Sequence, residues 1–197
     1  THEVLEEVGG SALSYFDPET GYEELVFGYR GLRSALAERL NDRDARTLGA
    51  DNLILTSGAV QALSLAARAF AGPGDAVFVE AVTFPYAASF LEGTGADVVP
   101  VPVDADGLDV GALAEAIAAA VARGLRPKLV YTIATFQLPT GMSMSTDRRV
   151  RLLELAEQHQ LVVIEDNVYY DLRYDGEAPP TLLSMDTTGL VMQCDSF

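Results

Sequence analysis

The sequence predicts an α/β fold, a three-layer domain with a mostly parallel sheet flanked by helices. Short apolar runs alternate with helical patterns along most of the 197 residues, as in parallel strands joined by right-handed crossovers. In residues 161–170, an apolar run with three β-branched residues predicts a strand buried on both faces. This run ends abruptly in two carboxylates, an Asn and two Tyr, at the strand end where such sheets bind ligands.

The composition is that of a globular domain with an acidic surface. Hydrophobic residues make up 49% of the chain, and 29 acidic against 13 basic residues give a net charge of −16. This charge disfavours nucleic acid and anionic membranes as partners, and solubility is its simplest explanation. The single cysteine, Cys194, and the lack of a signal peptide or long apolar run predict a cytoplasmic location. Because the chain begins at Thr1 and ends just after a predicted strand, we expect a piece of a longer protein.

The N-terminal part predicts few regular elements. Residues 1–27 are weakly periodic, and we expect an irregular surface segment there. Residues 29–40 carry apolar side chains on one face of a helix. The elements that follow are expected to be a strand over 52–56, a tight turn at 57–58, a helix over 59–70 and a turn at 72–75.

From residue 76 onward, strand and helix patterns alternate. Pro85 suits a helix start, and Asp147 in a first helical turn interacts favourably with the helix dipole. The predicted strands are 76–80, 98–103, 128–133, 161–165 and 190–194, and the predicted helices are 83–92, 108–122 and 146–159, with a loop over 136–144.

Residues 56–60 form a candidate anion-binding turn. They lead from a predicted strand into a helix N-terminus, where free N–H groups and the helix dipole favour an anion. The same pattern equally fits a plain strand–turn–helix connection. Neither G-x-x-x-x-G-K-[ST] nor G-x-G-x-x-G occurs, which disfavours a nucleoside triphosphatase or a dinucleotide enzyme.

Six short motifs occur in a fixed order along the chain. They are Ser57-Gly58-Ala59, Pro73-Gly74-Asp75, Thr83-Phe84-Pro85, the loop from Phe136 to Gly141, Asp166 with Tyr169, and Asp195-Ser196-Phe197. Together they resemble the pyridoxal-phosphate enzymes of fold type I, the class I/II aminotransferase family, over residues 28–197. The resemblance implies an aminotransferase-like large domain, incomplete here. It implies that residues 1–45 contribute to small-domain and dimer contacts and that residues 46–197 form the cofactor-binding domain.

The resemblance implies roles for individual residues, with Asp166 and Tyr169 as the catalytic candidates. Asp166 matches the carboxylate that keeps the pyridine nitrogen of pyridoxal 5′-phosphate protonated, so that the ring accepts electrons. Tyr169 matches the phenol that hydrogen-bonds O3′ of the cofactor, whereas Tyr170 is expected only to pack. Phe84 matches the aromatic side chain stacked on the ring. The expected phosphate cup consists of Gly58, Ala59, Val60 and Ser196.

Three features depart from the family's pattern. The cofactor-contacting Asn before Pro-Thr-Gly is Leu138 here, which loses a hydrogen bond worth about 0.5–1.5 kcal/mol, and Gln137 is a candidate substitute. Val60 replaces a polar residue that often helps to hold the phosphate, although its backbone N–H remains. The Schiff-base lysine is expected just beyond Phe197. The only lysine present, Lys128, precedes an apolar run and belongs at the wrong end of the sheet.

The leading interpretation is a pyridoxal-phosphate enzyme acting on an amino acid, most simply an aminotransferase that passes an amino group to a 2-oxo acid. Leu138 keeps open a specialised cyclase, eliminase or carbon–carbon bond-forming enzyme. The alternatives of another class are the effector-binding domain of a transcription regulator and a domain that has lost the cofactor. The resemblance also implies a homodimer, with Tyr22 a candidate contact to the partner's phosphate. No metal site, nucleic-acid partner or membrane partner is predicted.

Overall fold

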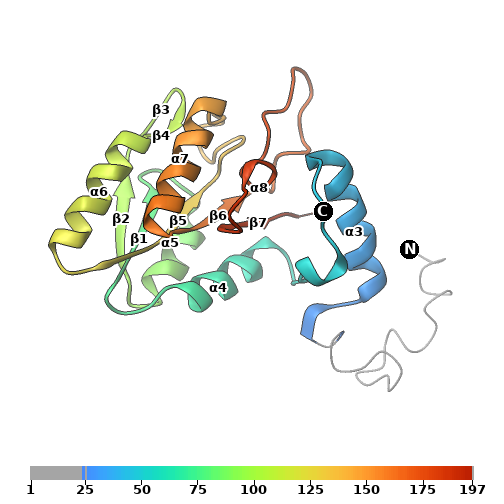
Figure 1. Cartoon of the computed structure of the whole chain (residues 1–197), viewed down its shortest axis with the longest axis horizontal. Helices are drawn as coiled ribbons and strands as arrows, with labels where there is room; N and C mark the ends of the chain where they lie inside the picture. The colour runs from blue at the N-terminus through green and yellow to red at the C-terminus, as the bar shows by residue number, and fades with distance from the viewer. Residues whose placement is uncertain (1–23, 25, 197) are drawn as a thin grey trace. The chain divides into compact units, whose positions relative to one another are not determined.

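The structure, a computed structural model, describes residue 24 and residues 26–196 (Figure 1). The chain divides into a unit that ends at Thr56 and a unit that begins at Ser57. Tyr22 and Phe197 lie outside the described residues. Of the helices that the structure describes, none has the length and apolar composition needed to cross a bilayer.

Helix α3 (Arg30–Asp44) is the main element of the N-terminal unit. It confirms the helix predicted over 29–40 and continues to Asp44, where Ala45 adopts a left-handed conformation with φ of 50°. The buried guanidinium of Arg33 donates hydrogen bonds of 2.9 Å to the carbonyl oxygens of Gly28 and Ala50. These bonds connect α3 to the segment before it and to the segment that follows it.

The strand predicted over 52–56 is wrong. A short 3₁₀ helix, η2 (Ala50–Asn52), occupies its start, and residues 53–56 have no regular structure. Leu55 donates one backbone hydrogen bond of 2.9 Å to Phe27, and Ile54 is 60% exposed. A strand is stabilised by a ladder of such bonds, which the described part of this unit does not supply. An apolar run alone does not reveal whether a neighbouring strand is present.

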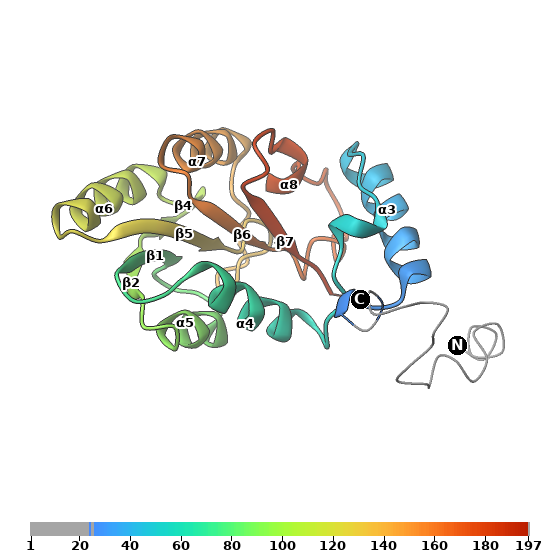
Figure 2. The same cartoon turned by 60° about the horizontal axis from the view of Figure 1, so that its bottom comes forward.

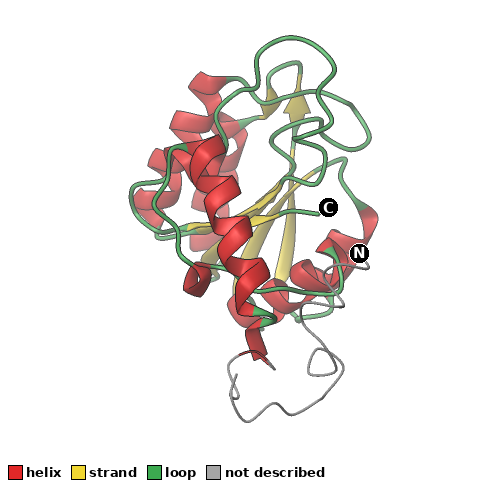
Figure 3. Cartoon of the chain, turned by 90° about the vertical axis from the view of Figure 1, so that its right-hand side faces the viewer, coloured by secondary structure: helices red, strands yellow, loops and turns green. Residues whose placement is uncertain are grey.

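The unit from Ser57 onward is built on a five-stranded parallel sheet with the order β2-β1-β5-β6-β7. The strands, yellow in Figure 3, lie side by side and confirm the predicted parallel sheet. They are β1 (Asp75–Glu80), β2 (Asp97–Val101), β5 (Arg126–Thr132), β6 (Val162–Asp166) and β7 (Val191–Cys194).

Helices cover both faces of this sheet, which confirms the three-layer prediction (Figure 2). Side chains alternate along β1, so Val77 and Val79 join one apolar core while Ala76 and Phe78 join the other. The first core lies under α4 (Ala59–Phe70) and α5 (Pro85–Glu92). The second lies under α6 (Val110–Ala122), α7 (Thr146–His159) and α8 (Leu182–Met185).

Two small features were not predicted. A hairpin of β3 (Val103–Asp104) and β4 (Gly107–Leu108) separates β2 from α6, where the sequence suggested one longer strand and one longer helix. Gly107 has φ of 95°, and an added Cβ would lie 3.0 Å from Met144, so a side chain does not fit there. Helix α8 has four residues, too few for a periodic pattern to predict it.

Candidate functional site

The candidate site lies at the carboxyl ends of the parallel strands, the edge at which such sheets bind ligands. Strand β6 ends at Asp166, and Tyr169 lies in the turn that follows. Phe84 is the N-cap of α5 after β1, Leu138 lies in the loop after β5, and Ser196 follows β7. The topology therefore brings the ends of four segments that are distant in sequence to one edge.

Asp166 is a buried carboxylate at this edge, 6% exposed. Its Oδ2 accepts a 2.6 Å hydrogen bond from the hydroxyl of Tyr131 in the neighbouring strand β5. Burial raises the pKa of Asp166 above its usual value, and the nearby charge of Asp195 adds to the increase. Hydrogen bonds from Tyr131 and from the backbone N–H of Val168 lower the pKa and stabilise the ionised carboxylate.

Tyr131 was not singled out from the sequence. It is 1% exposed and belongs to the core beneath α4 and α5. Burial and then the charge of Asp166 raise the pKa of its phenol, so Tyr131 keeps its proton and remains a donor. In the sequence it is one aromatic residue within an apolar strand. Tyr131 differs from other aromatic residues in apolar runs only by its position near the end of β5, the strand that pairs with β6.

The paired tyrosines after β6 have different environments. Tyr169 is 37% exposed, whereas Tyr170 is buried and its hydroxyl donates a 2.9 Å hydrogen bond to the carbonyl oxygen of Pro179. Tyr170 therefore packs as expected. Tyr169 keeps a phenol that a ligand can reach.

The turn before α4 presents backbone donors. Gly58 is the N-cap of α4 with φ of 87° and has no side chain to cap the helix. Among the described residues, the side chain of Gln61 accepts a hydrogen bond from the N–H of Ser57, just before the helix. The N–H groups of Gln61 and Ala62 bond to the carbonyl oxygen of Gly58, but those of Ala59 and Val60 have no partner in the described chain. A Cβ added to Gly58 would meet no atom of the described residues within 4 Å. Free N–H groups at an open helix start suit an anion.

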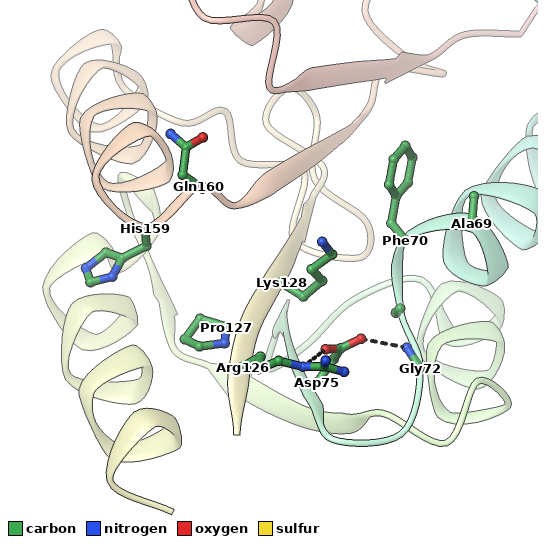
Figure 4. Close-up of a pocket in the computed structure, with 10 residues that line it drawn as sticks. Ala69, Phe70, Gly72, Asp75, Arg126, Pro127, Lys128, His159 and Gln160 are labelled. Carbon is green, nitrogen blue, oxygen red and sulfur yellow. Dashed lines mark hydrogen bonds and ion pairs between the residues drawn. The ribbon is translucent and has the colours of Figure 1, made fainter. Parts of the chain in front are cut away.

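This turn points to the same edge of the sheet as Asp166. Helix α4 ends at Phe70, beside the amino ends of β1 and β5 at Asp75 and Arg126 (Figure 4). Its 12 residues span about 18 Å, roughly the length of the strands on which it packs. The start of α4 therefore lies toward the carboxyl ends of the strands.

Phe84 and Leu138 are both partly buried against the apolar core beneath α4 and α5. The ring of Phe84 also lies against Tyr86, with centroids 5.4 Å apart. The side chain of Leu138 offers only apolar atoms. The site therefore receives an aromatic and an aliphatic contact from these two positions, and no hydrogen-bond donor from the second.

The suggestion that Gln137 substitutes for the missing donor is wrong. Its Nε2 donates to Glu80 Oε2 at 2.9 Å and to the carbonyl oxygen of Val82 at 2.6 Å. Its Oε1 accepts from the N–H and the hydroxyl of Thr140, at 3.1 and 2.5 Å. The amide thus uses its full hydrogen-bonding capacity, with both donors bound at the end of β1 and its oxygen bound to Thr140 in the loop. The sequence does not show that Glu80, more than fifty residues earlier, binds it.

Glu80 is a second buried carboxyl near the site, 1% exposed at the end of β1. Its Oε1 accepts from the hydroxyl of Thr132 at 2.6 Å and from the N–H of Ile133 at 3.1 Å. Burial raises the pKa of Glu80 to about 7, although these hydrogen bonds oppose the increase. Glu80 therefore joins the end of β1 to the end of β5 and to the loop that carries Leu138.

Arg149 in α7 holds the other side of that loop. It is fully buried and donates to the carbonyl oxygens of Met144 and Ala134 and to the hydroxyl of Thr135. Its Nη1 also lies 3.6 Å from Oε1 of Glu165. Burial raises the pKa of Glu165 to about 7. Glu165 in turn accepts the first two backbone N–H groups of α8.

A hollow of about 590 Å³ lies at the opposite, amino-terminal ends of the strands (Figure 4). Asp75 and Arg126 form an ion pair of 2.9 Å there. Lys128 lines the same hollow, which confirms that this lysine is at the end of the sheet away from Asp166.

The sequence model described as aminotransferase class I and II matches residues 25–197. The chain belongs to this family. The resemblance drawn from six short motifs is thereby confirmed, and the fold agrees with that of solved family members.

Named relatives extend this result. Aromatic-amino-acid aminotransferase 1 from Thermococcus litoralis is 38% identical over 197 residues, which cover 100% of this chain and 45% of the relative. The kynurenine aminotransferase of Pyrococcus horikoshii, solved with PMP, is 34% identical with a TM-score of 0.87, over 100% of this chain and 46% of that one. An uncharacterised HTH-type transcriptional regulator of Escherichia coli is 34% identical over 178 residues, covering 90% of this chain and 36% of the regulator. The chain spans less than half the length of these relatives.

Proposed function

We propose that the protein is a pyridoxal-phosphate-dependent aminotransferase that moves an amino group from an amino acid to a 2-oxo acid. Family membership and similarity to named aminotransferases support this proposal. The observation that carries it is the buried Asp166 at the end of β6, at the same edge as the open start of α4. A bound pyridoxal phosphate would supply the electron sink for chemistry at the α-carbon of the substrate.

The residues at this edge fit the cofactor. Asp166 would face the pyridine nitrogen and hold a proton on it. The free N–H groups of Ala59 and Val60, with the exposed hydroxyl of Ser196, would hold the phosphate. Phe84 would stack on the ring, and Tyr169 would donate to O3′. Leu138 would leave O3′ with one donor fewer than in the family's pattern.

The full-length protein tests this proposal. It is mixed with pyridoxal phosphate, single amino acids and 2-oxoglutarate, and the glutamate formed is measured. We expect transfer by the wild type and none by Asp166→Ala. The matched control is Asp175→Ala, which removes an exposed carboxylate and should leave the rate unchanged. Normal turnover by Asp166→Ala would remove the role given to this carboxylate.

Two other candidates each have one supporting observation. Leu138 favours a specialised pyridoxal-phosphate enzyme, in which the substrate is consumed but no glutamate forms. The similarity to an HTH-type regulator favours an effector-binding domain. A helix-turn-helix segment before Thr1 and binding of DNA by the full-length protein would support the regulator. Amino transfer without DNA binding would exclude it.

We further propose that the protein is a cytoplasmic homodimer whose cofactor site lies at the subunit interface. Family membership supports this assembly. Sedimentation of the full-length protein should give the mass of a dimer. A fully active monomer would contradict the proposal.

A further inference from the structure

Tyr131 and Asp166 form a buried pair on neighbouring strands. Tyr131 in β5 is opposite Ile164 in β6. Asp166 is two residues beyond Ile164, so its side chain lies on the same face of the sheet and diagonally across from Tyr131. The hydroxyl of Tyr131 reaches Asp166 Oδ2 at 2.6 Å, and the side chains are 1% and 6% exposed. A hydrogen bond of this length from a hydroxyl to a carboxylate is charge-assisted and stronger than a neutral one.

The charges around this pair explain why the hydroxyl matters. Asp195 and Cys194, from the β7 side, and Glu80, from β1, are the further ionisable groups that act on Tyr131 or Asp166. Each of them is neutral or negative, so none stabilises a negative charge on Asp166. The donors that do so are the hydroxyl of Tyr131 and the backbone N–H of Val168.

We propose that Tyr131 is a positioning residue that keeps the negative charge on Asp166 and thereby keeps the ring nitrogen of the cofactor protonated. This inference rests on the proposed function. A proton between a carboxylate and a pyridine nitrogen can lie on either atom. Because burial disfavours charge separation, the charged arrangement persists only where donors stabilise the carboxylate. Without the hydroxyl of Tyr131, the proton shifts toward Asp166 and the ring becomes a weaker electron acceptor.

The test uses Tyr131→Phe in the full-length protein loaded with pyridoxal phosphate labelled with ¹⁵N in the ring. The ¹⁵N chemical shift reports how much of the ring nitrogen is protonated. Loss of a hydrogen bond to a charged group should change the ratio of protonated to neutral ring by roughly tenfold to a hundredfold. The signal of Tyr131→Phe should therefore move toward that of neutral pyridine, and the cofactor should dissociate more readily.

Tyr170→Phe is the matched control, because it also removes a buried hydroxyl, bonded to Pro179. Its ¹⁵N signal should stay at the wild-type position. Circular dichroism checks that each variant folds. If Tyr131→Phe does not fold, Tyr131→Met removes the donor with another apolar side chain and should give the same displacement.

The outcomes separate this inference from the proposed function. A wild type that binds no pyridoxal phosphate would overturn both. A wild type that binds it with a protonated ring nitrogen, together with an unchanged signal in folded Tyr131→Phe, would overturn only the role of Tyr131. Equal displacement in Tyr131→Phe and Tyr170→Phe would also overturn it, because the effect would then follow from any lost hydroxyl.

Discussion

Glu80 and Gln137 are joined by a 2.9 Å hydrogen bond between two buried side chains. The same amide of Gln137 binds the carbonyl oxygen of Val82, two residues before Phe84. Gln137 also directly precedes Leu138. One amide therefore fixes the segment that carries the aromatic contact of the site and the segment that carries the aliphatic one.

Replacement of Gln137 by Leu should destabilise the fold. It removes a donor from Glu80 and from the carbonyl of Val82 and an acceptor from Thr140, and unpaired buried groups cost about 1–3 kcal/mol each. We expect the free energy of unfolding, measured by urea titration, to fall by at least that amount. Gln158→Leu on the exposed face of α7 is the control and should change it by less than about 0.5 kcal/mol. An equal free energy of unfolding for the two variants would show that the hydrogen bonds of Gln137 contribute nothing to stability.

The stability of the protein should depend on pH through Glu80. Its pKa is about 7 in the folded state and 4.5 ordinarily, so the folded state binds more protons between these values. Stability from this group is therefore complete below pH 4.5, falls as the pH rises to about 7 and stays low above it. Glu80→Gln does not titrate, so the wild type should lose about 3 kcal/mol relative to the variant across this window. Urea unfolding at a series of pH values measures the difference in free energy of unfolding between the wild type and Glu80→Gln. A difference that does not change with pH would contradict the raised pKa of Glu80.

Arg149→Met should be strongly destabilising. Methionine fills much of the space but leaves Glu165 and several carbonyl groups buried without their cation, a loss of about 3–5 kcal/mol. Thermal and urea unfolding measure it, with Arg151→Met on the exposed face of α7 as the control. Adding Glu165→Gln should recover part of the loss, because the unpaired charge is then absent. Strict additivity of the two substitutions would argue against the pair.

Leu138→Asn should restore a donor to the candidate site. A donor stabilises an ionised O3′ on the bound cofactor, and a neutral hydrogen bond is worth roughly half a pKa unit to one unit. The pH midpoint of the cofactor's visible absorption should therefore move down by about that amount. Leu138→Met keeps the position apolar and should leave the midpoint in place. If the pH midpoint of Leu138→Asn equals that of the wild type, residue 138 does not reach O3′.

The sheet and the position of Asp166 could be predicted from the sequence because both depend on local patterns. The apolar run before Asp166 contains enough β-branched residues to specify a buried strand, and its polar end marks the edge where ligands bind. The helix that begins at Ala59 was predicted with its observed bounds because its Ala- and Leu-rich run stops at a Gly-Pro-Gly turn.

Features that depend on distant partners could not be predicted. Gln137 was a candidate substitute for the missing donor because the sequence does not show its pairing with Glu80. That pairing depends on β1 and β5 lying next to each other. Tyr131 was missed for the same reason, since its contact with Asp166 spans two strands. The failed strand over 52–56 shows the converse, because a suitable run does not form a strand without a neighbour.

The register of β6 and β7 places Cys194 opposite Asp166. The thiol of Cys194 is therefore an intrinsic probe of the separation of β7 from the sheet. The thiol is 2% exposed, and burial raises its pKa to about 12. Because only the thiolate reacts readily, an alkylating reagent at neutral pH meets a group that is both shielded and protonated. The rate at which Cys194 is modified would therefore report how often β7 separates from the sheet, at a position directly before Asp195 and Ser196.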